Sequence, residues 1–332
     1  MTEVLRVEGL KKHFPVVRGL LRRAVGQVKA VDGVSFSIAA GETLCLVGES
    51  GCGKSTVAKT ILRLVEPTDG RIWLGGTEVT ALSEAAMHPH RRQIQMVFQD
   101  PYSSLNPRMT AGEIVGEPLE NYGLAHGADK EQRVLALLEK VGLRADAMKR
   151  FPFEFSGGQR QRLGIARALA LNPRVIVADE PVSALDVSVQ AQVLNLLMDL
   201  QDEFGLAYLF VSHDLGVVEH IGHRITVMYL GRIVELADKA TLFRRPLHPY
   251  SEALIAAAPV PDPRVNRDRI VLEGDVPSPM DPPPGCHFHT RCPYAVGRCR
   301  TDEPPLAEVE PGHFVACHLR PPGGPFEKLV PT

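Results

Sequence analysis

The sequence predicts an α/β fold with a parallel sheet, an inserted α-helical subdomain and a small proline- and cysteine-rich C-terminal domain. First, the apolar segment Thr43–Val47 leads through a glycine-rich turn into a helical pattern. Second, strand and helix patterns alternate over residues 175–211, which favours a parallel sheet. Third, residues 1–245 hold 9 of the 27 prolines and residues 246–332 hold the other 18. The last segment is therefore compositionally distinct.

Residues 1–98 predict short strands separated by turns. Alternating residues at 34–38 lead through Gly41 into the continuous apolar run of Thr43–Val47, which suits a strand buried on both faces. Residues 54–65 predict a helix because their apolar residues fall on one side. These residues are Val57, Ala58, Ile61, Leu62 and Val65.

Helical periodicity dominates residues 103–165, notably at 134–141, with Gly142 as the expected stop. Strand character returns at 175–178, a helix is expected over 187–203, and another strand over 207–211. We interpret the helical block as an insertion into the α/β core.

Length and charge exclude several classes of protein. A chain of 332 residues suggests about two domains. Its 37 Lys and Arg against 39 Asp and Glu give a net charge of −2, which argues against a nucleic-acid partner. No apolar run approaches the ~18 residues that cross a bilayer, and the N-terminal residues lack the pattern of a signal peptide. We therefore expect a cytoplasmic protein with reduced thiols.

Residues 48–56 read G-E-S-G-C-G-K-S-T and match the phosphate-loop pattern G-x-x-x-x-G-K-[ST]. The glycines allow backbone N–H groups to converge on phosphate at the positive end of the following helix. Lys54 is expected to reach the β- and γ-phosphates, and the Ser55 hydroxyl to bind Mg²⁺. The pattern predicts binding of a nucleoside triphosphate. The candidate residues are Gly48, Ser50, Gly51, Gly53, Lys54, Ser55 and Thr56.

Residues 175–180, V-I-V-A-D-E, form an apolar strand that ends in two acids. Asp179 suits a Mg²⁺ ligand that acts through water, and Glu180 suits a general base that polarises the attacking water. Two adjacent acids favour hydrolysis by water over transfer to a substrate hydroxyl.

The stretch F-S-G-G-Q at 155–159, followed by R-Q-R-L-G-I-A-R-A-L, resembles the signature of the ATP-binding-cassette (ABC) ATPases, with Phe155 where Leu is usual. The resemblance implies a P-loop NTPase core with a RecA-like parallel sheet and an N-terminal antiparallel β region. It also implies that two such chains pack head to tail and bury ATP between one phosphate loop and the other signature. The signature residues expected to hold the facing γ-phosphate are Ser156, Gly157, Gly158 and Gln159.

Further motifs of this family follow in order. Gln99 resembles the glutamine that senses Mg²⁺ and the attacking water. The resemblance therefore implies that Gln99 contacts Mg²⁺ together with Ser55 and Asp179. Residues 183–186, S-A-L-D, resemble the loop that crosses the dimer interface and ends in Asp186. His213 in F-V-S-H-D resembles the γ-phosphate switch histidine. Phe14 is the candidate for stacking on adenine, where the family more often has Tyr.

Several segments resemble the bacterial oligopeptide and dipeptide import branch: residues 100–110, 180–192 and 228–235, H-P-Y at 248–250, and G-D-V-P-S-P in the tail. The resemblance implies an ATPase that energises di- or oligopeptide uptake from the cytoplasmic face of the inner membrane. It implies a second, similar ATPase in a heterodimer (a homodimer is the alternative), two membrane permeases that dock near residues 100–118, and indirectly an extracytoplasmic binding protein. We assign residues 1–250 to the nucleotide-binding domain and 251–332 to the C-terminal domain.

The tail carries Cys286, Cys292, Cys299 and Cys317, spaced C-x5-C-x6-C-x17-C. Four thiolates in a reducing compartment suggest Zn²⁺ or an iron–sulfur cluster. The sequence lacks the C-x2-4-C pair of structural zinc sites, which favours a cluster, and the resemblance points to [4Fe–4S]. A mixed site with nearby histidines and a set of unliganded thiols stay open. The histidines are His287, His289, His313 and His318.

Three other functions stay open at this point: a non-transport ABC-type ATPase, an importer ATPase for nickel, glutathione or a sugar, and a redox- or iron-sensing tail with the ATPase as its effector. The net charge of −2 argues against the first of these.

Overall fold

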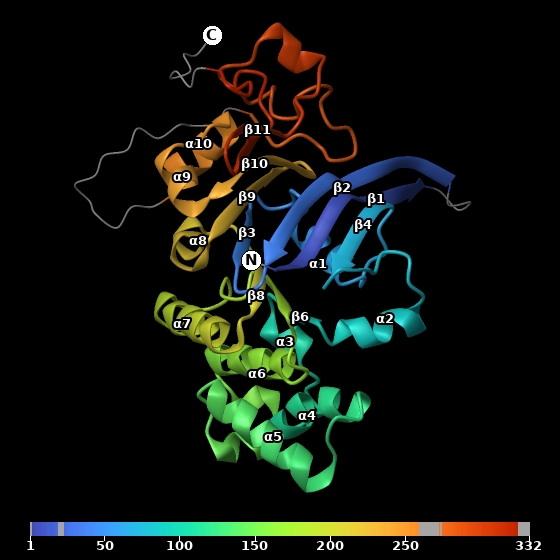
Figure 1. Ribbon diagram of the computed structural model, residues 1–332, viewed down its shortest axis with the longest axis vertical. Coiled ribbons are helices and arrows are strands. Elements are labelled where there is room, and N and C mark those ends of the chain that lie inside the picture. The colour runs from blue at the N-terminus through green and yellow to red at the C-terminus, as the bar shows by residue number, and fades with distance from the viewer. Residues whose placement is uncertain (1, 19–22, 259–271, 273, 325–332) are drawn as a thin grey trace, which may run out of the picture. The chain divides into compact units, whose positions relative to one another are not determined.

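The computed structural model describes residues 2–18, 23–258, 272 and 274–324, which fall into two compact units (Figure 1). The first unit takes residues 1–5, 38–42 and 73–211, and the second takes residues 6–37, 43–72 and 212–332. Four strands have residues in both units: β1 (Glu3–Arg18), β2 (Arg23–Ala39), β4 (Asp69–Leu74) and β8 (Ala207–Ser212), of which only Ser212 belongs to the second unit.

The first unit contains three parallel strands in the order β6–β7–β8. They are β6 (Ile94–Val97), β7 (Val175–Asp179) and β8 (Ala207–Ser212). Ile94 pairs with Val175, which in turn pairs with Ala207. All residues of β7 and β8 are buried, as expected for strands covered on both faces. The unit also holds the short β5 (Thr77–Glu78), antiparallel to β4.

Helices make up the rest of the first unit. They are α2 (Glu84–Arg91), α3 (Pro101–Ser104), α4 (Ala111–Asn121), α5 (Gly127–Lys140), α6 (Gly157–Leu169) and α7 (Val187–Phe204), with short 3-10 turns η1 (Ala145–Lys149) and η2 (Pro152–Glu154). Helix α4 contacts α5 and α6, so these segments form the predicted helical subdomain, drawn in green in Figure 1.

The second unit has β3 (Thr43–Val47) parallel to β9 (Arg224–Tyr229), and β9 antiparallel to β10 (Arg232–Asp238). The C-terminal strands β11 (Ala307–Glu310) and β12 (His313–Val315) extend the same sheet, because β12 pairs with β10. The helices are α1 (Lys54–Ile61), α8 (Leu215–Ile221), α9 (Lys239–Arg244) and α10 (Pro249–Ala257), with the 3-10 turn η3 (Gly297–Arg300).

The N-terminal strands are longer than the sequence predicted. β1 has 16 residues and β2 has 17, where short strands separated by turns were expected. Gly9 and Gly33 lie inside these strands with φ of 56° and 87°, and the Gly9 N–H donates to the Ser35 hydroxyl at 2.8 Å. The glycines therefore mark irregularities within the strands rather than their ends. Helix α1 is shorter than predicted and ends at Ile61, since Arg63 takes a left-handed φ of 51°.

The C-terminal segment is anchored by a buried carboxylate. Glu235 on β10 has no exposed surface, and its side chain accepts backbone N–H groups from Leu247 at 2.8 Å and His248 at 2.9 Å. His313 Nε2 on β12 lies 2.7 Å from the same carboxylate. A buried acid is tolerated when donors satisfy its oxygens. The tail thus packs on the sheet of the second unit, where β12 pairs with β10.

An aromatic cluster completes this core. Phe288 from the cysteine-containing segment is 1% exposed and packs against Tyr229, His248 and Tyr250, with ring centroids 5.3–5.7 Å apart. Burial lowers the pKa of His248 to about 4, so the ring is neutral at pH 7 and its Nδ1 caps α10 by accepting from the Tyr250 N–H at 3.1 Å. Among the described residues, no helix has the length and apolar character needed to span a membrane.

Candidate nucleotide site

The phosphate loop follows β3 and needs glycine at two positions. A Cβ atom on Gly48 would lie 2.2 Å from the Met228 carbonyl oxygen, and one on Gly53 would lie 2.0 Å from the Ala30 carbonyl oxygen. Both residues also have positive φ, 154° and 109°. Gly53 is the N-cap of α1, whose first turn carries no acidic residue. The helix thus presents uncapped N–H groups and its positive end to the loop, which suits an anion.

Lys54 turns back into the loop instead of extending into solvent. Its Nζ donates to the Gly48 carbonyl at 2.7 Å and to the Glu49 carbonyl at 3.0 Å, and the residue is 5% exposed. The ammonium group is therefore held in the concave side of the glycine-rich turn. Ser55 and Thr56 follow in the first turn of α1 and are half-buried, while Ser50 and Gly51 are exposed at the tip of the loop.

His213 is brought to the phosphate loop by the second unit. It directly follows β8, and the next residue, Asp214, caps α8 by accepting N–H groups from Gly216 and Val217. A cavity of about 340 Å³ is lined by both His213 and the start of the loop. Its lining includes Val47, Gly48, Glu49, His213, Asp214 and Leu254. The predicted γ-phosphate contact thus faces the same space as the phosphate loop.

The two acids and the glutamine meet in the first unit. Asp179 is the last residue of β7 and is 4% exposed. Glu180 adopts a left-handed φ of 47°, which is rare for a residue with a side chain and is often found at functional sites. Gln99 Nε2 donates to Glu180 Oε2 at 2.9 Å. The structure thus joins the predicted base to the predicted water sensor, which lie 81 positions apart in the sequence.

The signature segment opens helix α6 with a reciprocal cap. The Ser156 hydroxyl accepts from the Gln159 N–H at 3.3 Å, and the Ser156 N–H donates to Gln159 Oε1 at 3.0 Å. A serine hydroxyl that accepts a hydrogen bond keeps its own proton to donate. Gly158 is required by packing, since a Cβ there would lie 2.3 Å from Val189 Cγ1. Gly157 is exposed beside it.

Asp186 and Phe14 have local roles in the structure. Asp186 is the N-cap of α7, where its Oδ1 accepts from the Val189 N–H at 3.0 Å and the Ser188 hydroxyl at 2.7 Å. The Ser188 hydrogen bond lowers the pKa of Asp186. Phe14 lies on β1, 37% exposed, with Lys12 Nζ 4.9 Å from its ring centroid. Their proposed interface and adenine contacts stay predictions.

The predicted site residues divide between the two units. The second unit holds Phe14, the phosphate loop and His213, and the first unit holds Gln99, the two acids, the signature and Asp186. Sequence reasoning missed the groups that hold Glu49 in the loop. The Tyr250 hydroxyl accepts from the Glu49 N–H at 2.8 Å, and Arg291 forms a bidentate pair with its carboxylate. The H-P-Y motif was noted in the sequence, but only as a family marker.

The four tail cysteines lie in the C-terminal segment, where Cys299 is buried and Cys286, Cys292 and Cys317 are half-buried. The Cys286 N–H donates to the Cys299 carbonyl at 2.9 Å. Burial, followed by repulsion from the other three thiolates, raises the pKa of Cys317 to about 12. Burial likewise raises the pKa of Cys292 to about 11, with Cys286 and Cys299 as additional causes. Over the described residues, however, no three His, Cys, Asp or Glu side chains are grouped closely enough to hold a metal ion.

The alternative of a mixed Cys/His zinc site is therefore not supported. Three of its candidate histidines have other partners: His313 contacts Glu235, His289 Nδ1 contacts the Cys286 carbonyl, and His318 Nε2 contacts the Asp302 carbonyl. Each of these contacts uses one ring nitrogen of its histidine.

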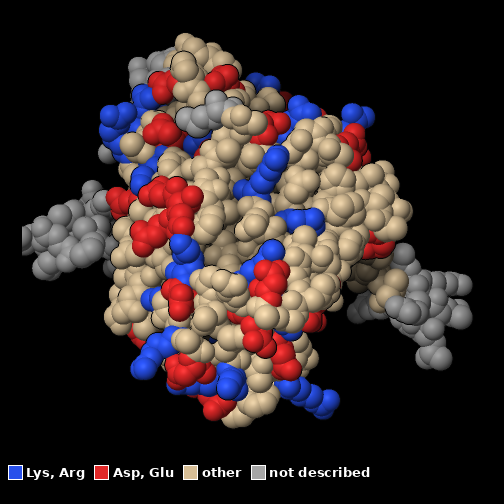
Figure 2. Space-filling view, turned by 60° about the horizontal axis from the view of Figure 1, so that its bottom comes forward, with Lys and Arg blue, Asp and Glu red and all other residues tan. Residues whose placement is uncertain are grey.

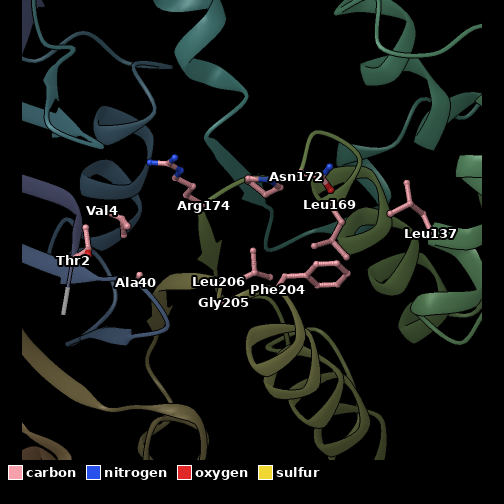
Figure 3. Close-up of a pocket in the computed structure, with 11 residues that line it drawn as sticks. Thr2, Val4, Ala40, Leu137, Leu169, Asn172, Arg174, Phe204, Gly205 and Leu206 are labelled. Carbon is pink, nitrogen blue, oxygen red and sulfur yellow. The ribbon is translucent and has the colours of Figure 1, made fainter.

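A separate cavity of about 510 Å³ lies in the first unit, between the end of α7 and the segment that precedes β7. Figure 3 shows Leu169 and Phe204 beside it, with Arg174 at another part of its wall. None of the predicted site residues lines this cavity. On the face of the molecule in Figure 2, Lys and Arg are interspersed with Asp and Glu.

Two family models match the chain. The model for ABC transporters matches residues 31–183, and the model for the C-terminal region of oligopeptide/dipeptide transporters matches residues 234–299. The chain is 59% identical over 319 residues to a probable peptide ABC transporter ATP-binding protein, y4tS of Sinorhizobium fredii, covering 96% of this chain and 90% of the relative. It is 55% identical to the oligopeptide transport ATP-binding protein AppF of Bacillus subtilis, covering 95% and 97%.

Solved structures resemble it as well. The dimeric ATP-binding cassette MJ0796 in a post-hydrolysis state, bound to ADP and Pi, aligns with a TM-score of 0.62 at 31% identity and covers 71% of this chain and 98% of that one. CbiO1 of Clostridium perfringens, part of an ABC transporter complex, aligns with a TM-score of 0.63 at 25% identity and covers 74% and 92%.

Proposed function

This chain belongs to the ABC transporter ATPases of the oligopeptide and dipeptide import family, and from that premise we propose how its residues divide the work of one ATPase cycle. It is the ATP-binding subunit of a peptide importer and couples ATP hydrolysis to import. The predicted P-loop α/β fold with an antiparallel β region and a helical subdomain is confirmed by its likeness to solved ABC ATPases.

The phosphates of ATP bind to the loop at 48–56. Lys54 and the N–H groups at the start of α1 neutralise them, and Ser55, Asp179 and Gln99 are the residues that would hold the Mg²⁺ that accompanies ATP. Glu180 accepts a proton from the attacking water, and Gln99 orients that water. The observation that carries this assignment is the 2.9 Å hydrogen bond from Gln99 Nε2 to Glu180 Oε2. This hydrogen bond holds the amide of Gln99 beside the carboxylate of Glu180. A water molecule next to both groups could then be oriented by the amide and lose a proton to the carboxylate.

Each γ-phosphate is contacted by His213 of the chain that binds the ATP and by the signature residues of the partner ATPase. His213 contacts it in the same chain, an assignment supported by the cavity that His213 shares with the phosphate loop. ABC ATPases dimerise, and the Ser156 hydroxyl and the N–H groups at the start of α6 serve the ATP bound to the partner ATPase. The partner is a second, similar ATPase, so the working unit is a heterodimer.

The permease-docking surface lies at residues 100–118. Asp100 caps α3 by accepting the Tyr102 N–H at 2.8 Å, which holds this short helix in place after Gln99. The Tyr102 ring is 59% exposed and has the Arg160 guanidinium 5.0 Å from its centroid. Tyr102 is exposed and lies three residues after Gln99, which contacts the proposed general base Glu180. A permease bound at Tyr102 would therefore be close to the residues that change during ATP hydrolysis. The chain thus acts as a peripheral subunit at the cytoplasmic face of the membrane.

Reconstitution tests the function directly. When this chain is co-expressed with its neighbouring ATPase and two permeases, the four should purify as one complex. In proteoliposomes, a peptide-loaded binding protein should raise ATP turnover, whereas the same protein loaded with nickel or glutathione should not. Stimulation by one of those solutes would instead assign another cargo, and failure of the chain to associate with permeases would favour a non-transport ATPase.

We also propose that the four tail cysteines hold a [4Fe–4S] cluster. The support is the full or partial burial of the four side chains, the hydrogen bond between the Cys286 and Cys299 backbones, and the raised pKa values of Cys286, Cys292 and Cys317. A cluster accepts thiolates that are spread wider than the ligands of one ion. Anaerobically purified protein should contain about four irons per chain, and Cys317→Ser should lower that content. Iron-free native protein would rule the cluster out, and Cys45→Ser serves as the control because Cys45 lies on β3.

A further inference from the structure

The C-terminal cysteine segment reaches the phosphate loop through one ion pair. Arg291 Nη1 and Nη2 donate to Glu49 Oε2 and Oε1 at 2.8 and 3.1 Å. The arginine side chain is 7% exposed and the glutamate side chain 28%. Both residues belong to the second unit and lie 242 positions apart. Bidentate, poorly hydrated pairs of this kind are among the stronger ionic contacts in proteins.

Glu49 places a carboxylate inside the phosphate loop. It follows Gly48 directly, its carbonyl accepts from Lys54 Nζ, and it lines the cavity that it shares with His213. A carboxylate there adds negative charge to a loop whose N–H groups and lysine attract phosphate. Uncompensated, this charge would repel a nucleotide that carries several negative charges.

The surroundings of Arg291 hold its guanidinium on that carboxylate. The Arg291 N–H donates to the Phe288 carbonyl at 3.0 Å, and Phe288 is fixed in the aromatic cluster. The guanidinium carbon lies 6.0 Å from the Tyr229 ring centroid. The Tyr250 hydroxyl separately receives the Glu49 N–H at 2.8 Å. The loop residue is thus bound at its backbone by α10 and at its side chain by the cysteine segment.

We propose that Arg291 is a positioning residue of the nucleotide site, which neutralises Glu49 and thereby makes ATP affinity depend on the docked C-terminal segment. The inference rests on the proposed ATP site in the phosphate loop. Arg291 acts through Glu49 rather than on the nucleotide itself. An ATPase lacking this segment would need a neutral residue at the position of Glu49, or another cation beside it.

Titration of the full-length chain with Mg²⁺ and the non-hydrolysable analogue AMP-PNP tests the proposal by calorimetry. Arg291→Met should weaken binding about tenfold, which corresponds to about 1.4 kcal/mol. Glu49→Gln should leave the affinity unchanged or tighten it up to about threefold, because it removes the repelling charge. The double variant should recover most of the loss. In steady state, Arg291→Met should raise KM for ATP with kcat within about twofold, as expected for a loss of uniform binding.

The double variant separates charge from packing. If Arg291 only anchored its segment, the double variant would bind as weakly as Arg291→Met, and that result would overturn the proposal. Native affinity in Arg291→Met would overturn it as well. Arg298→Met is the matched control, because Arg298 forms an exposed pair with Asp302 in the same segment. It should bind like the native chain.

If Arg291→Met does not fold, Glu49→Gln still tests the proposal. This near-isosteric change at a partly exposed side chain should not weaken nucleotide binding. A tenfold loss of affinity in Glu49→Gln would contradict the proposed repulsion between Glu49 and the nucleotide. If the native chain itself does not bind AMP-PNP, the proposed ATP site fails, and that failure is distinct from native binding with insensitive variants.

Discussion

Replacing Glu180 with Gln should reduce ATP turnover by about 10²–10⁴-fold while leaving ATP binding within about twofold of native. The amide keeps the size of the side chain and its contact with Gln99, which donates to Glu180 Oε2 at 2.9 Å. It cannot accept a proton from water. Binding is retained because the phosphate loop, with Lys54, lies in another segment. Phosphate release by the purified ATPase complex measures turnover, and nucleotide retention on a filter measures binding.

A matched control exists in the same unit. Glu203, near the end of α7, pairs with Lys140 at the surface and is 46% exposed, so Glu203→Gln should hydrolyse ATP at the native rate. Native turnover by Glu180→Gln would show that another group takes the proton. A complex that hydrolyses slowly because it no longer binds ATP would point to a structural role for Glu180 instead.

Lys54→Ala should weaken ATP binding about 100-fold, equivalent to about 2.7 kcal/mol. Lys54 is 5% exposed, and its ammonium group donates to the Gly48 and Glu49 carbonyls. Its loss removes the buried cation of the loop and leaves two carbonyl oxygens directed toward the phosphate site. Both changes disfavour an anion. Titration with fluorescent ATP measures the loss.

Lys59→Ala is the control for this change. Lys59 lies in the last turn of the same helix and is exposed, so its removal should alter affinity by less than about twofold. Circular dichroism should show that both variants fold. Undiminished binding by folded Lys54→Ala would mean that nucleotide binds elsewhere, and the phosphate-loop assignment would have to be abandoned.

Local sequence patterns predicted most secondary structure well. The strands at 43–47 and 175–179 and the helix at 187–204 lie within a residue or so of their predicted ends. Their apolar periodicity and capping residues act over short spans, so no distant residue is needed to determine them. The prediction of short strands separated by turns failed at β1 and β2, which are long strands with Gly9 and Gly33 inside them. A glycine with positive φ has the same local signal in a turn and in a bulge.

The sequence also predicted the chemistry of the phosphate loop, since glycines at 48 and 53 followed by Lys54 and Ser55 have few other uses. It could not predict the partners of those residues. The four tail cysteines were found by spacing, yet their spacing did not reveal that Arg291, among them, contacts the loop. The H-P-Y motif likewise did not indicate that the Tyr250 hydroxyl receives the Glu49 N–H.

Sequence alone therefore predicted the candidate site residues, and the tertiary structure determined which of them contact one another. Gln99 meets Glu180 across 81 positions, His313 meets Glu235 across 78, and Arg291 meets Glu49 across 242. Strand order, strand register and the packing of the C-terminal segment bring these pairs together. Backbone propensity carries no information about a contact at such separation, because the contact depends on how whole elements bury their apolar faces against one another.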